Sequence, residues 1–178
     1  MRPNIRRVFV NVGINLDSLK GRTVYLSKTL RDFGYVDDVI VDPKFGVLAV
    51  VSHASRHGTW AFPYQDVQLT NDRITVDERG SRSPRVFLRQ GRSYQDLIGA
   101  QAIQPDGTIL GRIKDIVLID VPTGEIAYDV SPRGLSQLWS PTFRVRAATD
   151  VVADDHNRIV VVPNQARTET PINFKEAA

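Results

Sequence analysis

Two histidines stand four residues apart in the stretch Ser52-His-Ala-Ser-Arg-His-Gly58. This spacing brings two imidazoles to one metal ion when the pair lies on a helix. Here the stretch is small and polar, lies between two predicted strands and has no acidic third ligand nearby. We therefore interpret His53 and His57 as residues of a solvated hairpin loop, and we expect no metal site. His156 falls within Asp154-Asp-His-Asn157, whose composition is typical of a turn.

Two carboxylates are more suggestive, because Asp38 and Asp115 each lie in the middle of a predicted strand among aliphatic neighbours. A carboxylate in such surroundings could act as a general base. A buried acid more often accepts hydrogen bonds from backbone or hydroxyl groups. The two aspartates occupy matching positions of an internal repeat, and one active site needs only one copy. We therefore expect both residues to be structural.

Other catalytic signatures are absent from the sequence. It contains no Gly-x-Ser-x-Gly elbow, no P-loop and no Gly-x-Gly-x-x-Gly motif. The lack of cysteine excludes disulfides, thiolate zinc sites, iron–sulfur clusters and cysteine nucleophiles. We expect no catalytic residues, no cofactor and no enzymatic activity, and an unknown hydrolase ranks last among the functions considered.

The strongest electrostatic feature is a run of arginines between residues 79 and 92, bracketed by acidic residues on both sides. The run could contact RNA phosphates, anionic lipid or an acidic protein face. It could equally be a soluble linker whose charges keep it hydrated. A tryptophan on the predicted loop 131–143 could fill a barrel end or anchor an interface. The candidate partner-binding residues are Arg79, Arg82, Arg85, Phe87, Arg89, Arg92 and Trp139.

Composition sets broad limits. The 178 residues are 42% hydrophobic and 24% charged, which is ordinary for a folded protein, and the net charge is only +3. This excess is too small to establish a nucleic-acid partner. The N-terminus carries Arg2, Arg6 and Arg7 but no long apolar run, so we expect no signal peptide. No window approaches about 18 apolar residues, so we expect no integral membrane segment and a cytoplasmic location.

The chain is organised around a predicted hairpin over residues 111–130. We expect Ile113, Val117 and Ile119 on one face of its first strand, with Ile116 and Leu118 on the other. The same pattern occurs over residues 34–51, so Gly46 in the first turn matches Gly124 in the second. Glycine at these positions supplies the positive φ of a tight turn. We assign structural roles to Asp38, Gly46, Asp115 and Gly124.

Matched strands joined by unequal loops indicate an internal duplication. Many short strands separated by Gly, Pro and Asp turns predict small barrels. Because small halves bury little surface alone, we expect the two to support one another. The predicted layout is an N-terminal arm over residues 1–17, with a strand over 5–16, a first barrel over 18–78, a basic linker over 79–94, a second barrel over 95–163 and a polar tail over 164–178.

The stretch from Leu97 to Asp120, which contains Gln-Pro-Asp-Gly-Thr-Ile-Leu-Gly-Arg-Ile-Lys-Asp, resembles the opening of a PRC-barrel domain. The segments Thr-Gly-Glu-Ile-Ala-Tyr and Asn-Arg-Ile-Val-Val extend this likeness through the second repeat. The first repeat resembles the family in its central strand, its hairpin and Phe62-Pro-Tyr-Gln-Asp-Val67. It departs at Ser27–Phe33, where the Pro-Asp-Gly turn is missing.

The resemblance implies an all-β fold of two tandem small PRC-like β-barrels related by internal duplication. The family is used as an assembly module and has no catalytic signature. Its best-known settings are the cytoplasmic domain of the photosynthetic reaction centre H subunit and a domain of a bacterial ribosome maturation factor. We therefore expect a scaffold that docks into a larger protein complex, first a photosynthetic or membrane-associated one at its cytoplasmic face. Peripheral membrane contact and self-association stay open, and the alternative is an RNA- or ribosome-associated maturation factor.

Overall fold

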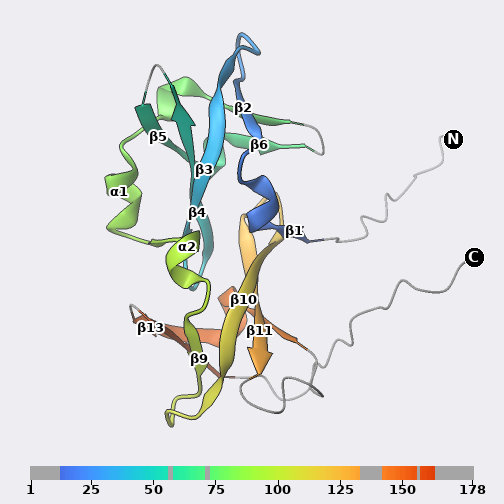
Figure 1. The fold of residues 1–178 in the computed structure, drawn as a ribbon, viewed down its shortest axis with the longest axis vertical. Helices are drawn as coiled ribbons and strands as arrows, with labels where there is room; N and C mark the ends of the chain where they lie inside the picture. The colour runs from blue at the N-terminus through green and yellow to red at the C-terminus, as the bar shows by residue number, and fades with distance from the viewer. Residues whose placement is uncertain (1–12, 56–57, 71–72, 133–141, 156, 163–178) are drawn as a thin grey trace, which may run out of the picture.

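The structure is a computed structural model that describes residues 13–55, 58–70, 73–132, 142–155 and 157–162. Within these residues the strands form two seven-stranded sheets (Figure 1), which confirms the predicted all-β tandem fold. The first sheet contains β2 (Thr23–Leu26), β3 (Asp32–Asp42), β4 (Gly46–Ala54), β5 (Gly58–Pro63), β6 (Val67–Leu69), β7 (Ile74–Val76) and β8 (Arg92–Ser93). The second sheet contains β1 (Ile14–Asn15), β9 (Gln101–Ile103), β10 (Ile109–Asp120), β11 (Glu125–Pro132), β12 (Phe143–Arg146), β13 (Val151–Asp155) and β14 (Arg158–Val161).

Helical turns connect these strands. The longest among the described residues, α1 (Pro84–Leu88), begins after Ser83 with proline at its first turn, a position that suits the fixed φ of proline. The others are η1 (Leu16–Leu19), η2 (Tyr64–Asp66), η3 (Glu78–Gly80), α2 (Tyr94–Leu97) and α3 (Ala147–Asp150). No helix in the described part of the chain is long and apolar enough to cross a membrane.

The two sheets have the same topology. Their orders are β5-β4-β3-β2-β7-β6 and β12-β11-β10-β9-β14-β13. In both, the central strand forms an antiparallel hairpin with the next strand, and a short parallel pair, β2–β7 or β9–β14, brings the end of the repeat back beside its beginning. The duplication inferred from sequence is therefore a duplication of strand order and register.

The face assignment within the long hairpin strand was wrong, because β10 contains a bulge between Ile113 and Asp115. A bulge inserts one unpaired residue and so shifts the alternation of side chains. Ile113 therefore shares the main core with Ile116 and Leu118, whereas Val117 is buried outside that cluster. The second half of this strand is buried on both faces, since Ile116, Val117 and Leu118 are all buried.

Each sheet takes one strand from the sequence that precedes the other repeat. β1, before the first repeat, pairs with β10 of the second sheet, where Asn15 lies opposite Val117. β8, before the second repeat, pairs with β3 of the first sheet, where Ser93 lies opposite Ile40. The turns that follow, η1 and α2, lie against the same strands. The two repeats of this polypeptide thus exchange strands reciprocally, as the two chains of a domain-swapped dimer do.

The N-terminal strand expected over residues 5–16 lies partly outside the described residues. Ile14 and Asn15 form a strand added to another sheet, as expected of an arm, whereas Leu16 already begins η1. The main core is continuous across both sheets, and it includes Leu19 and Leu97 from the two exchanged turns. The halves therefore bury their apolar surface jointly.

Tyrosines join the two hairpin turns. Tyr64 of η2 donates a 2.6 Å hydrogen bond to the Val121 carbonyl, and Tyr128 of β11 donates one of 2.6 Å to the Pro43 carbonyl. Burial, reinforced by the charge of Asp120, raises the pKa of the Tyr64 hydroxyl to about 12. Each hairpin tip is thus held by a side chain from the opposite sheet.

Candidate functional site

No three His, Cys, Asp or Glu side chains gather as metal ligands within the described ranges. His53 lies at the end of β4, and its Nδ1 is 3.0 Å from the Thr59 hydroxyl across the hairpin. His57 and His156 lie outside the described residues. The geometry of His53 is that of a cross-strand polar pair.

Asp38 sits at the bulge of β3, where both its carboxylate oxygens accept hydrogen bonds. One oxygen accepts from the Val39 amide at 2.8 Å, and the other accepts from the Ser93 hydroxyl at 2.5 Å. Ser93 belongs to β8, the strand contributed by the other repeat. Burial raises the pKa of the Asp38 carboxyl, although the hydrogen bonds from Ser93 and Val39 oppose this shift.

Asp115 repeats this arrangement at the bulge of β10. It accepts from the Ile116 amide at 2.7 Å, and its second oxygen accepts a short hydrogen bond from the Asn15 side-chain amide of β1. The Tyr94 hydroxyl also donates to it at 3.4 Å. Burial raises the pKa of the Asp115 carboxyl, again opposed by hydrogen bonds. The two aspartates therefore fasten the exchanged strands.

Asn15 and Ser93, the donors at these joints, were missed by sequence reasoning. Each is also the N-cap of the turn that follows: the Asn15 side chain accepts from the Asp17 amide, and the Ser93 hydroxyl accepts from the Gln95 amide. A capping residue before a short turn is a recognisable signal. The matched signals are Asn-Leu-Asp-Ser-Leu19 and Ser-Tyr-Gln-Asp-Leu97.

Gly46 and Gly124 meet where the hairpins touch. The Val47 amide of one hairpin donates to the Gly124 carbonyl of the other at 2.9 Å. A Cβ on Gly46 would lie 2.2 Å from that carbonyl oxygen, and Gly46 has a φ of +143°. Glycine is required there for both space and conformation. We propose that both glycines keep the hairpins in contact.

The run of arginines over residues 79–92, here called the arginine segment, is attached to the edge of the first sheet. Ala61 of the edge strand β5 and Arg82 exchange two backbone hydrogen bonds of 2.8 Å. From there α1 runs along the sheet (Figure 1), and Phe87 packs on a second apolar cluster. That cluster consists of Ile40, Ala49, Val51 and Ala61. The linker is therefore folded onto the outer face of the first sheet.

The arginines of this segment divide into two groups. Arg92 forms an ion pair with Asp154 of β13, and its side chain is only 15% exposed, so it joins the two sheets. The other four, Arg79, Arg82, Arg85 and Arg89, are exposed and make no ion pair within the described part of the chain. The sequence between Arg79 and Gln95 contains no acidic residue.

Two apolar side chains accompany these charges on α1. Val86 and Leu88 are each 45% exposed, whereas Phe87 between them faces the sheet. A basic surface with exposed aliphatic residues can bind an acidic partner through charge and apolar contact together. Trp139, the remaining candidate residue, lies outside the described residues.

The PRC-barrel domain family model matches residues 12–82 of the chain. No curated protein matches the chain. The matched range includes β1 even though β1 pairs within the second sheet. The matched range falls on the first repeat, whereas the sequence motifs resemble the family more clearly in the second repeat.

Proposed function

Since residues 12–82 match the PRC-barrel domain family, we propose that this protein is a non-enzymatic docking module for protein subunits of a larger complex. PRC-barrel domains mediate protein interactions and form a non-catalytic family. The single observation that supports a docking role most directly is the arginine segment, folded onto the first sheet with its charges exposed.

The surface formed by α1 and the preceding turn suits an acidic protein face. It carries the exposed Val86 and Leu88 together with four exposed arginines, Arg79, Arg82, Arg85 and Arg89. Arginine is enriched both at protein interfaces and among the few residues that dominate binding energy, and neighbouring apolar side chains add contact area from which water is excluded. Because Phe87 fixes α1 to the sheet, this surface is already ordered before a partner binds.

Among complexes, we propose a photosynthetic or other membrane-associated assembly, with the module at its cytoplasmic face. The support for this setting is the resemblance of the chain to the family members used in that way. An RNA- or ribosome-associated role is the alternative, and it would use the same arginines on phosphates.

The test is affinity capture with the purified full-length protein, followed by titration of the isolated partner at two salt concentrations. We expect Arg85→Glu combined with Arg89→Glu to weaken partner binding at least tenfold, because two attractive charges become repulsive. Leu88→Ser should weaken it independently of salt. Arg73→Glu, a charge reversal of an exposed arginine at the turn before β7, serves as the matched control and should bind normally.

Titration with single-stranded RNA distinguishes the docking proposal from the RNA alternative. Binding to single-stranded RNA through several phosphates would show a log–log salt slope of roughly 0.7 per contact. Submicromolar RNA affinity that collapses with salt and with the double reversal would replace the docking proposal by the RNA alternative. Equal loss of partner binding in the Arg73→Glu control would show that net charge, and not this surface, drives the association.

A further inference from the structure

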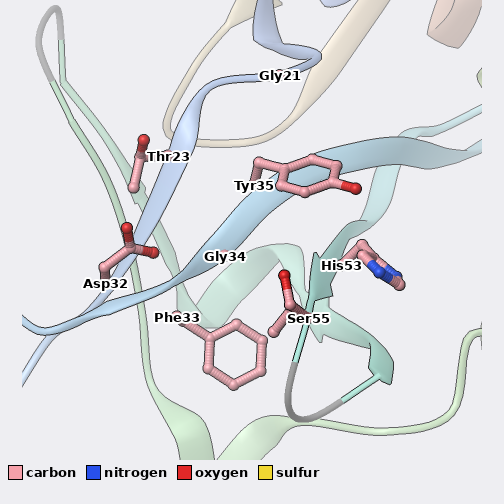
Figure 2. Close-up of a pocket in the computed structure, with 9 residues that line it drawn as sticks. Gly21, Thr23, Asp32, Phe33, Gly34, Tyr35, His53 and Ser55 are labelled. Atoms are coloured by element: carbon pink, nitrogen blue, oxygen red, sulfur yellow. The ribbon is translucent and has the colours of Figure 1, made fainter.

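An open hollow of about 620 Å³ lies on the first sheet. Its lining residues fall between Gly21 and Ser55 and include none of the arginine segment. Its floor is Gly34 of β3, and Gly21 and Thr23 border it at the start of β2. Figure 2 shows Asp32 and Thr23 on one side of Gly34, with Tyr35 and His53 on the other. The nine lining residues include the carboxylate of Asp32 but no lysine or arginine.

Gly34 marks a point beside the hollow where only glycine fits between β3 and β4. A Cβ at this position would lie 2.2 Å from the His53 carbonyl oxygen, so the two strands approach closely here. The second sheet has the same feature, since a Cβ on Gly111 would lie 2.2 Å from the Ser131 carbonyl oxygen. Both sheets thus have a glycine at the equivalent close approach of two strands.

The strand register fixes which residues correspond. Tyr35 lies opposite Thr23 and His53, and Arg112 lies opposite Gln101 and Ser131. The turns before these strands also match. The Gly21 amide donates to Val36, and the Gly99 amide donates to Ile113, each at 2.8 Å. Arg112 therefore occupies the place of Tyr35, and Gly99 that of Gly21.

In the second sheet a side chain of the protein itself, Arg112, occupies the site beside the Gly99 carbonyl. Nη1 of the Arg112 guanidinium donates a 2.7 Å hydrogen bond to the Gly99 carbonyl. Among the described residues, no side chain donates to the corresponding Gly21 carbonyl. The first sheet has Tyr35 at the position of Arg112, and this residue is 44% exposed. It also has the exposed Asp32 where the second sheet has Ile109.

We propose that the hollow of the first sheet binds the guanidinium group of an arginine on a partner protein. The group takes the position that Arg112 holds in the second sheet and donates to the Gly21 carbonyl. The Tyr35 ring offers a face on which a guanidinium stacks, and the Asp32 carboxylate at the rim attracts its charge. This surface is chemically opposite to the arginine segment, so the protein presents one cationic and one cation-accepting surface.

A guanidinium suits the hollow better than an ammonium. It is planar, weakly hydrated and able to stack on a ring while donating in its own plane. An ammonium is a strongly hydrated point charge and gains less from an open aromatic face. The internal precedent at Arg112 is also an arginine.

The experiment uses amide NMR spectra of the full-length protein titrated with the blocked peptide acetyl-Gly-Arg-Gly-amide. We expect saturable shifts of the Gly21, Thr23 and Gly34 amides. The same peptide with citrulline, which is neutral and nearly the same shape, should give none. Asp32→Asn should weaken binding about threefold, the effect of one exposed charge.

Two further variants use the duplicated fold as an internal control. Tyr35→Arg should place a guanidinium on the Gly21 carbonyl from within and abolish peptide binding without loss of thermal stability. Arg112→Ala should open the second hollow and add peptide-induced shifts at Gly99 and Gln101.

Absence of saturable shifts in the wild-type protein would overturn the proposal, and so would undiminished binding in the Tyr35→Arg variant. A third peptide, acetyl-Gly-Lys-Gly-amide, should bind more weakly, and equal binding of it would overturn the guanidinium assignment. The arginine-segment variants should bind this peptide normally, which keeps the test separate from that of the docking surface.

Discussion

The outer faces of the two sheets differ at equivalent strand pairs. In the first sheet Val51 of β4 lies opposite Ala61 of β5, and both belong to the apolar cluster on which Phe87 packs. In the second sheet the corresponding pair is Asp129 opposite Arg144, joined by two hydrogen bonds of 2.7 and 2.9 Å. Both aspartate oxygens are used, so the arginine is held in a bidentate pair.

This difference shows how one duplicated backbone acquires two surfaces. Where the cross-strand pair is apolar, a covering element is needed, and α1 covers the first sheet and carries the exposed arginines with it. Where the pair is ionic, the face can meet water directly, and a second pair between Arg146 and Glu125 extends it. The surface proposed for docking therefore depends on the side chains of the sheet beneath it.

The largest expected effect comes from exchanging these pairs. Val51→Asp places an unpaired carboxylate beneath α1, and its burial should lower the free energy of unfolding by about 4 kcal/mol. Asp129→Val in the second sheet removes one partner of a partly exposed ion pair, which should change stability by less than about 1 kcal/mol. Urea unfolding of both variants followed by far-UV circular dichroism measures this contrast.

Val51→Ala is the control for lost volume and should cost less than Val51→Asp. Similar losses in Val51→Asp and Asp129→Val would mean that the two outer faces are equally buried. That result would contradict the contrast between a covered and an open face.

The hairpin turns give the second contrast. Gly46→Ala brings a Cβ against the backbone of the other hairpin, and we expect a loss of about 3 kcal/mol because backbone cannot move aside cheaply. Gly124→Ala meets the edge of the Tyr64 ring at 2.9 Å, and its φ is +79°. The Tyr64 ring can shift more easily than backbone, at the cost of straining its hydrogen bond to Val121, so this loss should be smaller, about 1–2 kcal/mol.

Thermal unfolding by differential scanning calorimetry orders the two glycine variants. Gly107→Ala, with a φ of +88° but nothing near its Cβ, isolates the conformational cost. If Gly46→Ala costs no more than Gly107→Ala, the hairpins do not press on one another at this point.

Much of the fold could be predicted from sequence because alternating apolar residues and glycine turns encode local structure. The two hairpins follow from such patterns, and matched aspartates and glycines revealed the duplication. The side-chain faces of β10 could not be predicted, since a bulge depends on pairing with the neighbouring strand rather than on composition.

The exchanged strands were out of reach for a related reason. β1 and β8 are two residues long, and so short a stretch carries no information about which sheet accepts it. Arg92 illustrates the consequence. It stands in sequence among candidate partner-binding arginines, but its partner is Asp154, which approaches it only when the two sheets are assembled.

The smallest contrast concerns the two aspartates that fasten the exchanged strands. Asparagine in place of Asp38 keeps one oxygen for the Val39 amide and turns its NH₂ group toward the Ser93 hydroxyl. A hydroxyl has one donor and two acceptor sites, so Ser93 can accept this bond. We expect Asp38→Asn to cost no more than about 0.5 kcal/mol.

Asp115→Asn should cost more, about 1–2 kcal/mol, because Asn15 cannot reverse its role. The Asn15 oxygen already accepts from the Asp17 amide as a helix cap, which leaves only its NH₂ group to face Asp115. The NH₂ groups of Asn15 and of the introduced asparagine would then face one another. Either the cap on the Asp17 amide or the hydrogen bond that holds β1 to β10 is lost. The measurement is the difference in urea midpoint between the two variants, with Asn15→Asp combined with Asp115→Asn as the rescue.

These carboxyls also make stability depend on pH. Burial raises the pKa of each above its ordinary value, so the folded state holds these protons more tightly than the unfolded chain. Their contribution to stability is therefore greatest in acid and declines as pH rises through the interval between the ordinary and the raised pKa. Either asparagine variant should flatten this decline relative to the wild type when unfolding is measured from pH 3 to 7. A decline that is unchanged in both would show that neither carboxyl is buried as the strand exchange requires.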